Sequence, residues 1–427
     1  MKNSGIEWIG EIPEDWEVKK FKNFFDIYGG SGFKEEYQGQ EKGDFPFCKA
    51  SDINGTEKNL TTARNYVSQE LVDKESYIVI PKNSILVSKI GEALKKNHRK
   101  VNLVNCIIDN NCEGFVLNTK NDINYLYYVL KCIDMSWFDN GGTIPSVNNF
   151  KLKNFFLPNC LYETQQRIAS YLDKKCSKIE ETIQNQQQVI EKLKAYKQSL
   201  ITEAVTGKIK IQKGKVCGKY ESYRDSGVEW IGKIPSGWEV GKFGRFAQVK
   251  SNLVDPNLYL EYPQIAPDNI GKGSGKLIDW QTVKDSGVIS WNHLFFKGQI
   301  VYSKIRPTLN KLIIAPFDGL CSADMYPIET NMYKQFFVYM MLSQYFVEQV
   351  GLITRDRVKM PKINQNELSG ILITVPTKKE QKEISDYLDK KCTAIDTAIE
   401  QKQKLIEKLT EYKKSLIYEC VTGKKEI

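Results

Sequence analysis

Two stretches of the chain, residues 165–208 and 381–424, carry apolar side chains at alternating steps of four and three residues, with polar interruptions. The apolar positions are Leu172, Cys176, Ile179, Ile183, Ile190, Leu193 and Leu200 in the first stretch, and Leu388, Cys392, Ile395, Ile399, Ile406, Leu409 and Leu416 in the second. This spacing predicts a long helix with one apolar stripe. Neither stretch contains proline, and Gly207 and Gly423 stand where each helix is expected to end.

An apolar stripe of this length needs a partner surface, and the nearest one is the other helix. We therefore expect the two helices to pair antiparallel as an intramolecular coiled coil with one globular module at each end. A helix from about Glu163 to Gly207 would be roughly 65 Å long at ~1.5 Å per residue. Two separate surface helices are the alternative interpretation.

The chain is also an internal duplication. The segment SGIEWIGEIP at residues 4–13 returns as SGVEWIGKIP at 226–235, and YLDKKC at 171–176 returns at 387–392. Between these blocks the sequence has diverged, but VSKI at 87–90 still matches YSKI at 302–305. A repeat of this kind predicts two copies of one supersecondary arrangement, with the same fold and different surfaces.

Outside the helices the pattern changes to short apolar runs separated by loops rich in Gly, Asn and Lys. We predict strands at 78–80, 85–87, 300–302 and 312–314, and helices near 125–132 and 336–345. The fold class is therefore α+β, with two globular domains, two long antiparallel helices and pseudo-twofold symmetry. The predicted boundaries are 1–160 for the first domain, 161–208 for the central helix, 209–225 for a linker, 226–378 for the second domain and 379–427 for the distal helix.

Composition and motifs argue against several classes of protein. The ten cysteines form no C-x-x-C pair and only two histidines are present, so we predict reduced thiols, no metal site and no catalytic residues. No apolar run approaches the ~20 residues of a membrane helix, and we expect a cytoplasmic protein. The chain also lacks G-x-G-x-x-G, H-E-x-x-H, G-x-S-x-G and an Asp/Asn-Pro-Pro-Tyr/Phe cluster.

One segment imitates a phosphate-binding loop. Gly227, Gly232 and Lys233 have the spacing of a P-loop, but Ile234 follows where Ser or Thr would hold magnesium, and the first copy has Glu11 in place of the lysine. We interpret the tryptophans and isoleucines of this motif as contacts that fix each module to the helices.

The net charge of +9 favours an anionic partner only weakly, because no module is strongly basic as a whole. Basic residues are instead concentrated in loops, where they could neutralise phosphates or bind guanine edges. The glycine-rich loops 29–32 and 271–275 are either phosphate contacts or tight turns. The candidate DNA-binding residues are Ser31, Lys34, Lys89, Lys95, Lys96, Arg99, Thr143, Ser146, Lys250, Lys304, Arg306, Lys311, Arg355, Arg357 and Lys359.

Taken together, these motifs resemble the specificity subunits of type I restriction-modification systems over essentially the whole chain. The resemblance rests on the openings WIGEIPEDW (8–16) and WIGKIPSGW (230–238), the segment GTIP (142–145), and the Gln-x-x-Ile-x-x-Tyr-Leu-Asp-Lys-Lys helices (165–175 and 381–391). The second module departs from it, because RVKMP at 357–361 replaces the Gly-Thr-Ile-Pro form. The resemblance therefore implies a different reading surface there.

The resemblance implies a non-catalytic subunit whose two target-recognition domains each read one half of a bipartite, asymmetric target in double-stranded DNA. The helices would fix the spacer and dock two methyltransferase subunits, which would hold S-adenosylmethionine. Restriction subunits using ATP and Mg would join for cleavage, and this chain would bind no cofactor and no membrane. The alternative is a coiled-coil scaffold whose modules bind proteins; sequence-selective, salt-dependent DNA binding would distinguish the two. A self-sufficient methyltransferase has no motif in its favour.

Overall fold

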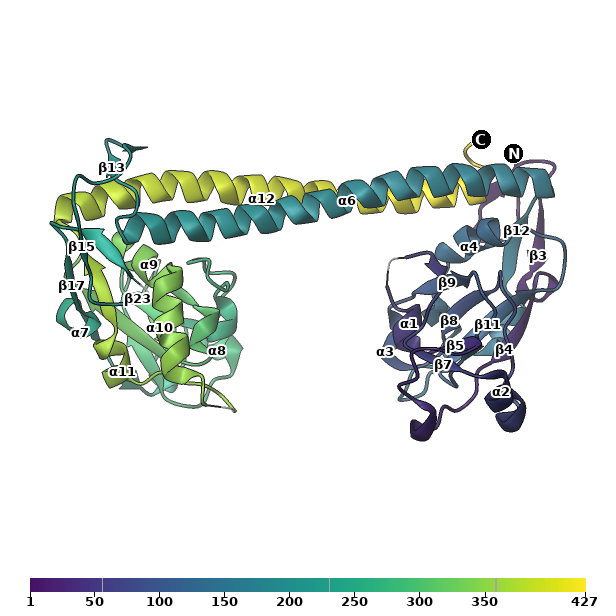
Figure 1. Ribbon diagram of the computed structural model, residues 1–427, viewed down its shortest axis with the longest axis horizontal. Helices are drawn as coiled ribbons and strands as arrows, with labels where there is room; N and C mark the ends of the chain where they lie inside the picture. Colours follow the sequence, from purple (N-terminus) through teal and green to yellow (C-terminus); the bar gives the residue numbers. More distant parts are fainter. Residues whose placement is uncertain (56, 230, 358) are drawn as a thin grey trace. The chain divides into compact units, whose positions relative to one another are not determined.

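The computed structural model describes residues 1–55, 57–229, 231–357 and 359–427. Trp230 and Val358, which belong to motifs named above, lie outside the described residues. The chain divides into two compact units, Met1–Asn185 with Lys404–Ile427, and Gln186–Gln403. Each unit contains one α+β module and a part of both long helices (Figure 1).

The two long helices are α6 (Tyr162–Val205) and α12 (Lys378–Val421). In the first unit Arg167 donates to the carbonyl of Ile427, and Lys413 forms an ion pair with Glu180. The second unit has the same antiparallel order in its own segments, with an ion pair of 2.8 Å between Lys197 and Asp396. Leu172, Cys176 and Ile179 of the predicted stripe are buried, as are their counterparts Leu388, Cys392 and Ile395. The helices therefore pair within each unit, and the prediction of a coiled coil is confirmed over separate surface helices.

The first module is built on a five-stranded sheet of order β4-β11-β8-β9-β6 and a three-stranded sheet of order β10-β5-β7. Strands β3 and β12 form a separate antiparallel pair at its two chain ends. The main elements are β3 (Glu17–Lys20), β4 (Phe25–Gly29), β5 (Phe45–Cys48), α1 (Ala50–Ile53), β6 (Asn59–Leu60), β7 (Asn65–Val67), α2 (Gln69–Glu75), β8 (Ile85–Ser88), α3 (Gly91–Lys95), β9 (Arg99–Asn102), β10 (Ile107–Ile108), β11 (Cys112–Leu117), α4 (Ile123–Lys131), α5 (Asn149–Lys153) and β12 (Phe156–Asn159).

The second module repeats this plan. Its four-stranded sheet, of order β18-β26-β23-β24, corresponds to β4-β11-β8-β9, and β17 pairs with β27 as β3 pairs with β12. A five-stranded sheet of order β19-β22-β25-β20-β21 completes it. The main elements are β15 (Tyr223–Asp225), β16 (Lys233–Pro235), β17 (Glu239–Lys242), α7 (Phe243–Phe246), β18 (Ala247–Val249), β19 (Leu253–Val254), β20 (Pro263–Ile265), β21 (Gln281–Thr282), α8 (Val283–Ser286), β22 (Asn292–Phe295), β23 (Ile300–Ser303), β24 (Leu312–Ile314), β25 (Gly319–Cys321), β26 (Met325–Thr330), α9 (Lys334–Leu342), α10 (Gln344–Thr354), α11 (Gln365–Gly370) and β27 (Leu372–Val375).

Most local predictions are confirmed, and one is wrong. The predicted strands at 85–87, 300–302 and 312–314 are β8, β23 and β24. Residues 78–80 form no strand; Ile80 makes one isolated bridge with Cys106 and is buried in a small core, whereas Ile78 is exposed. The predicted helical stretch near 336–345 is confirmed and consists of two helices, because Ser343 adopts an extended conformation between α9 and α10.

Each module is joined to the helix pair through a continuous apolar core. In the first unit the buried side chains of α4 pack with Leu172 and Cys176 of α6 and with Leu416 of α12. A partly buried hydrogen bond repeats this joint in both units, because the hydroxyl of Tyr128 donates to Asp173 at 2.7 Å and that of Tyr339 donates to Asp389 at 2.6 Å. The repeat in the sequence is therefore a repeat of this module-to-helix contact.

The two predicted helix-ending glycines form the second part of the joint. Gly423 has φ of 71°, and a Cβ built on it would lie 2.4 Å from Cδ of Pro13 and 3.3 Å from Trp16. Gly207 has φ of 72°, and its Cβ would lie 2.4 Å from Cδ of Pro235. Only glycine fits a left-handed conformation in such close contact. The proline and tryptophan of each opening motif therefore pack on the end of a long helix, as the interpretation of that motif requires.

Two further observations concern the whole described chain. All ten cysteines are free thiols. No single helix among the described residues combines the length and apolar character that a membrane crossing requires. Only α9 and α10 taken together, across a bend of 58°, meet those two criteria.

Candidate nucleic-acid interface

In the first module, two loops that are far apart in the sequence meet beyond the end of β8. The backbone N–H of Gly91 donates to the carbonyl of Pro145 at 2.8 Å, and that of Val147 donates to the carbonyl of Lys89 at 3.0 Å. An isolated bridge between Ile90 and Ser146 lies between these bonds. We name residues 89–96 together with 143–147 the first basic edge. It brings together five predicted site residues, namely Lys89, Lys95, Lys96, Thr143 and Ser146.

The second module has the same arrangement beyond β23. The N–H of Arg306 donates to the carbonyl of Pro361 at 2.7 Å, that of Ile363 donates to the carbonyl of Lys304 at 3.0 Å, and Ile305 bridges Lys362. We name residues 304–311 together with the described part of 355–363 the second basic edge. It brings together Lys304, Arg306, Arg355, Arg357 and Lys359. The first and second edges are therefore built on equivalent backbone contacts.

Arg306 has an unusual conformation in this edge. Its φ is 42°, and its side chain is exposed. Gly91 has the equivalent place in the first module with φ of 66°. A left-handed conformation costs a non-glycine residue roughly 1 kcal/mol or more, and such strain collects at functional sites. The second module retains an arginine where the backbone favours glycine.

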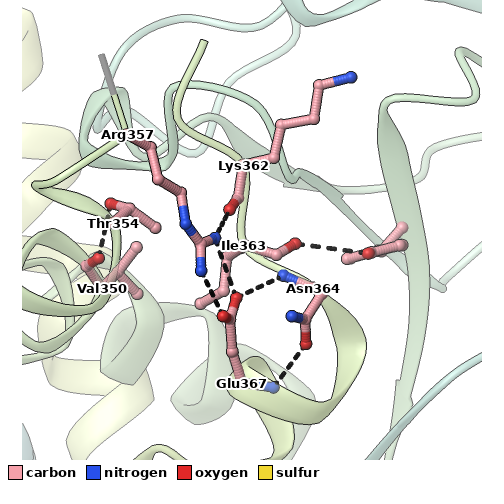
Figure 2. A network of polar contacts seen from close by, with 8 residues as sticks. Val350, Thr354, Arg357, Lys362, Ile363, Asn364 and Glu367 are labelled. Atoms are coloured by element: carbon pink, nitrogen blue, oxygen red, sulfur yellow. Dashed lines mark hydrogen bonds and ion pairs between the residues drawn. The ribbon is translucent and has the colours of Figure 1, made fainter. Parts of the chain in front are cut away.

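Arg357 is held by a polar network, which Figure 2 shows. Its guanidinium forms a two-pronged ion pair with Glu367 and donates to the carbonyl of Lys362. Glu367 in turn accepts from the N–H of Asn364 at 2.9 Å, and its own N–H donates to the Asn364 side chain. The hydrogen-bonded guanidinium of Arg357 holds the pKa of Glu367 below its usual value. Arg357 therefore orders the second basic edge, and any contact it makes with a ligand must compete with Glu367.

The first basic edge is held by a different carboxylate. Asp139 accepts from the N–H of Ser146 at 2.9 Å, and this bond is the main reason why the pKa of Asp139 is lowered. Sequence reasoning missed both Asp139 and Glu367, because neither stands in a repeated motif. It also missed Tyr128 with Asp173, although the recurrence of both as Tyr339 and Asp389 was a signal that could have found them.

Lysines on both edges are only partly neutralised. Lys95 pairs with Glu92 at 2.6 Å on the surface of α3, and Lys89 lies 4.0 Å from Glu113. Lys304 lies over the ring of Tyr326 at 5.2 Å, and Lys96 and Lys359 are exposed. Exposed cations of this kind are available to phosphate oxygens.

Two of the predicted residues lie in the protein interior. Arg99, in β9, is 2% exposed and donates to Asn97 and to the carbonyl of Ile133. Lys311 is buried against the carbonyl of Pro267 at 2.7 Å and pairs with Asp268 at 3.1 Å. Because neither side chain is free to reach a surface ligand in this structure, we leave both out of the interface proposed below.

The remaining predicted residues lie on other segments. Lys34 pairs with Glu75 at 2.9 Å, and Ser31 forms a parallel bridge with Asp109 after β4. Gly30, beside Ser31, has no room for a side chain, since a Cβ there would lie 1.9 Å from the carbonyl oxygen of Asp109. This glycine therefore serves a close backbone packing within the module. Lys250, after β18, donates to Gln248 at 2.7 Å.

Within the described part of the chain, no three His, Cys, Asp or Glu side chains come together as a group able to hold a metal ion. The segment that imitates a P-loop is likewise a packing element, because Val228 and Ile231 are buried in the core of the second unit.

Comparison with known proteins identifies the family. The model for the type I restriction modification DNA specificity domain matches residues 13–194 and again 235–410. The chain belongs to this family. Each match takes in one module and much of one long helix, so the type I specificity domain occurs twice here, as the internal repeat indicated.

Individual relatives agree with this assignment. The type I restriction enzyme EcoDI specificity subunit of Escherichia coli is 30% identical over 426 residues, which cover 97% of this chain and 89% of the relative. The MjaIX specificity subunit of Methanocaldococcus jannaschii is 26% identical, over 86% of this chain and 84% of the relative. A solved chain, from work on complex assembly and conformational transition of the type I R-M system, has a TM-score of 0.67 at 12% identity and covers 97% of this chain and 100% of its own. It supports the fold.

Proposed function

We propose that this chain is the DNA-reading subunit of a type I restriction-modification complex, and that each module reads one half of a two-part target through its basic edge. The observation that carries the proposal is the equivalent backbone contact of the two edges, Gly91 to Pro145 and Arg306 to Pro361. One scaffold thus presents two different sets of side chains. Reading two unlike half-sites requires such an arrangement, since base identity is read by side chains and not by the backbone that positions them.

The proposal assigns no chemistry to the chain itself. Two methyltransferase subunits docked on the helix pairs would hold S-adenosylmethionine, and restriction subunits would use ATP and Mg. The relatives named above are both called specificity subunits. In this proposal the chain likewise supplies the choice of target. The chain would accordingly act in the cytoplasm, where DNA and these partners meet.

The test is a reciprocal graft in the complex with the methyltransferase subunits. Replacing residues 17–159 with the matching region of a relative cuts the chain where Glu17 faces Asn159 in the β3–β12 pair. The matched graft, 239–375, cuts where Glu239 faces Val375 in β17–β27. Each graft should change one half of the methylated sequence and leave the other, as read by methylome sequencing. If a single graft altered both halves, the assignment of one module to one half-site would be wrong.

We further propose that helix length fixes the spacer between the half-sites. Helix α6 has 44 residues, which is about 66 Å at ~1.5 Å per residue. Seven residues inserted between Asn185 and Gln186, with seven more between Gln403 and Lys404, preserve the heptad in both helices. The insertion adds ~10.5 Å, which is about three base pairs at ~3.4 Å each. Methylomes should report the same half-sites with a longer spacer; an unchanged spacer would contradict the proposal.

A further inference from the structure

A groove in the first unit lies between the first module and helix α12. It encloses about 620 Å³ and is bounded by the end of α3, the end of α4 and the C-terminal turns of α12. Its lining residues are Lys96, Asn97, Lys131, Cys132, Thr410, Lys413, Lys414, Ser415, Ile417 and Tyr418. Four of these are lysines, and the neutral polar ones carry amide or hydroxyl donors. None of the described residues that line the groove is Asp or Glu, so its surface offers donors and positive charge to an anion.

The charge in this groove is only partly compensated. Lys413 has an ion pair with Glu180. For Lys131 and Lys414, no ion pair occurs within the described ranges. Lys131 is open to the water of the groove and is also surrounded by protein; burial, followed by the charges of Arg99 and Lys413, lowers the pKa of Lys131 to about 8. An anion bound beside it would remove that penalty.

A buried arginine lies directly behind the groove. Arg99 donates from Nη2 to the side chain of Asn97, a lining residue, at 2.5 Å and to the carbonyl of Ile133 at 3.0 Å. Its other two nitrogens, Nε and Nη1, are buried without a hydrogen-bond partner in the part of the chain that the structure describes. A buried cation without a counter-ion is costly, and its field is weakly screened. Arg99 therefore adds to the positive potential of the groove without touching its contents.

The internal repeat provides a comparison within the same chain. Arg99 faces Val87 in the β8–β9 pair, and Leu312 faces Tyr302 at the same place in β23–β24. Lys131 follows Tyr128 by three residues as Leu342 follows Tyr339, and Lys414 matches Gln198 in the two copies of the helix. The second unit thus has neutral residues at all three places.

The second unit also has a groove in the corresponding place. It encloses about 390 Å³, and its lining contains Gln198, Asn310 and Leu342 with a single lysine, Lys272. The two grooves are formed by equivalent elements but carry different charges. The cationic character therefore does not follow from the need to pack a module on a helix, because the second unit packs without it.

We propose that the groove of the first unit binds phosphate groups of the DNA backbone next to the half-site that the first basic edge reads. The proposal rests on the function proposed above. Continuity of the surface favours DNA as the source of the phosphate, because Lys96 belongs both to the first basic edge and to the groove lining. A strand that leaves the basic edge along α3 meets Lys131 and Lys414 next. These contacts add affinity without sequence information.

The test measures the salt dependence of DNA binding by the complex with its methyltransferase subunits. The double variant Lys131→Gln with Lys414→Gln removes two charges, and Lys408→Gln, which removes one charge at an exposed position of α12 outside the lining, is the control. Each neutralised phosphate contributes about 0.9 to the slope of log Kd against log salt. The slope of the double variant should fall by about 1 to 2 and that of the control should not change, with the same target sequence in both.

Each other outcome overturns the inference. If the unsubstituted complex binds its target with strong salt dependence and the double variant has the same slope, the groove holds no DNA phosphate and the proposed function still stands. A second outcome combines three results: inorganic phosphate or pyrophosphate raises the Tm of the full chain, the double variant abolishes this rise, and the salt slope of DNA binding is unchanged. The groove then binds a free phosphate compound. If the double variant loses methyltransferase subunits on size-exclusion chromatography, the groove binds an acidic protein segment.

Discussion

Gly91 in the first module and Arg306 in the second adopt left-handed backbone conformations with φ of 66° and 42°, and each donates its N–H to a proline carbonyl on the neighbouring loop. The backbone of the two basic edges is thus retained where the side chains differ most. The glycine satisfies the conformation without strain, whereas the arginine does not. The second edge thus carries an exposed guanidinium at the position where the first edge has only backbone.

The two edges also differ in how their loops are held. The first uses the carboxylate of Asp139 on the N–H of Ser146, and the second uses the ion pair of Arg357 with Glu367. A bond to a backbone N–H is independent of the loop's side chains, whereas an ion pair requires one particular residue in the loop. Position 357 of the second edge is therefore constrained by its ion pair with Glu367, whereas the bond that Asp139 makes to the first edge places no such requirement on the side chain of residue 146.

The largest effect on stability is expected at the two helix-ending glycines, where the two units are most alike. Gly423→Ala and Gly207→Ala each add a Cβ 2.4 Å from a proline carbon, at φ of 71° and 72°. Overpacking and left-handed strain together should lower the free energy of unfolding by about 2–4 kcal/mol in either variant. Urea denaturation of each variant checks this. A loss in one variant and none in the other would show that the two joints are not equivalent.

A smaller effect, on DNA binding, is expected at Arg306, the position where the two edges differ in side chain. Arg306→Gly should leave the free energy of unfolding nearly unchanged, because relief of strain offsets the greater freedom of the unfolded chain. If the guanidinium contacts a base, DNA affinity should fall by about 1–3 kcal/mol. Gly91→Ala is the matched change in the first edge and should cost stability instead. Undiminished affinity of Arg306→Gly for the target would remove Arg306 from the interface.

Replacing Arg99, the buried cation of the first module, by its counterpart in the second module should raise the free energy of unfolding. Arg99→Leu introduces the residue type that the second module has at 312 and removes two buried nitrogens without partners. Exchange of an uncompensated buried charge for an apolar side chain should raise the free energy of unfolding by about 1 kcal/mol. The pKa of Lys131 should rise above about 8, because Arg99 is one cause of its depression. NMR titration of the lysine and urea denaturation test both points, and a fall of both values would contradict them.

The smallest effect is the response of the two loops to acid. The folded-state pKa values of Asp139 and Glu367 lie below their usual values, so their bonds to the loops are present at neutral pH and are lost as the pH falls through those folded values. Titration of the carboxyl carbons by NMR should give midpoints below about 3.9 for Asp139 and about 4.3 for Glu367. In Arg357→Gln the midpoint of Glu367 should rise while that of Asp139 stays. A rise of both would mean that the loops are coupled in some other way.

The sequence alone determined the parts of this protein that depend on periodicity and repetition. The step of four and three residues predicted α6 and α12, since a helix must place its apolar residues on one face to bury them. The repeated openings predicted a repeated joint, and Gly207 and Gly423 were identified as helix ends because few residues other than glycine adopt the left-handed conformation there. The family could be recognised for the same reason, because its motifs lie in these repeated contacts.

Only the tertiary structure decided which basic residues belong together. Arg99 and Lys96 are close in the sequence, but the side chain of Arg99, in strand β9, lies in the core and that of Lys96 is exposed. Lys131 and Lys414 come from segments hundreds of residues apart and line one groove, and in the sequence each is an ordinary helix lysine. Burial, ion pairing and the potential of a groove depend on distances between segments that no local pattern encodes. The same limit applies to Arg357, whose partner Glu367 is defined by the fold of the loop between them.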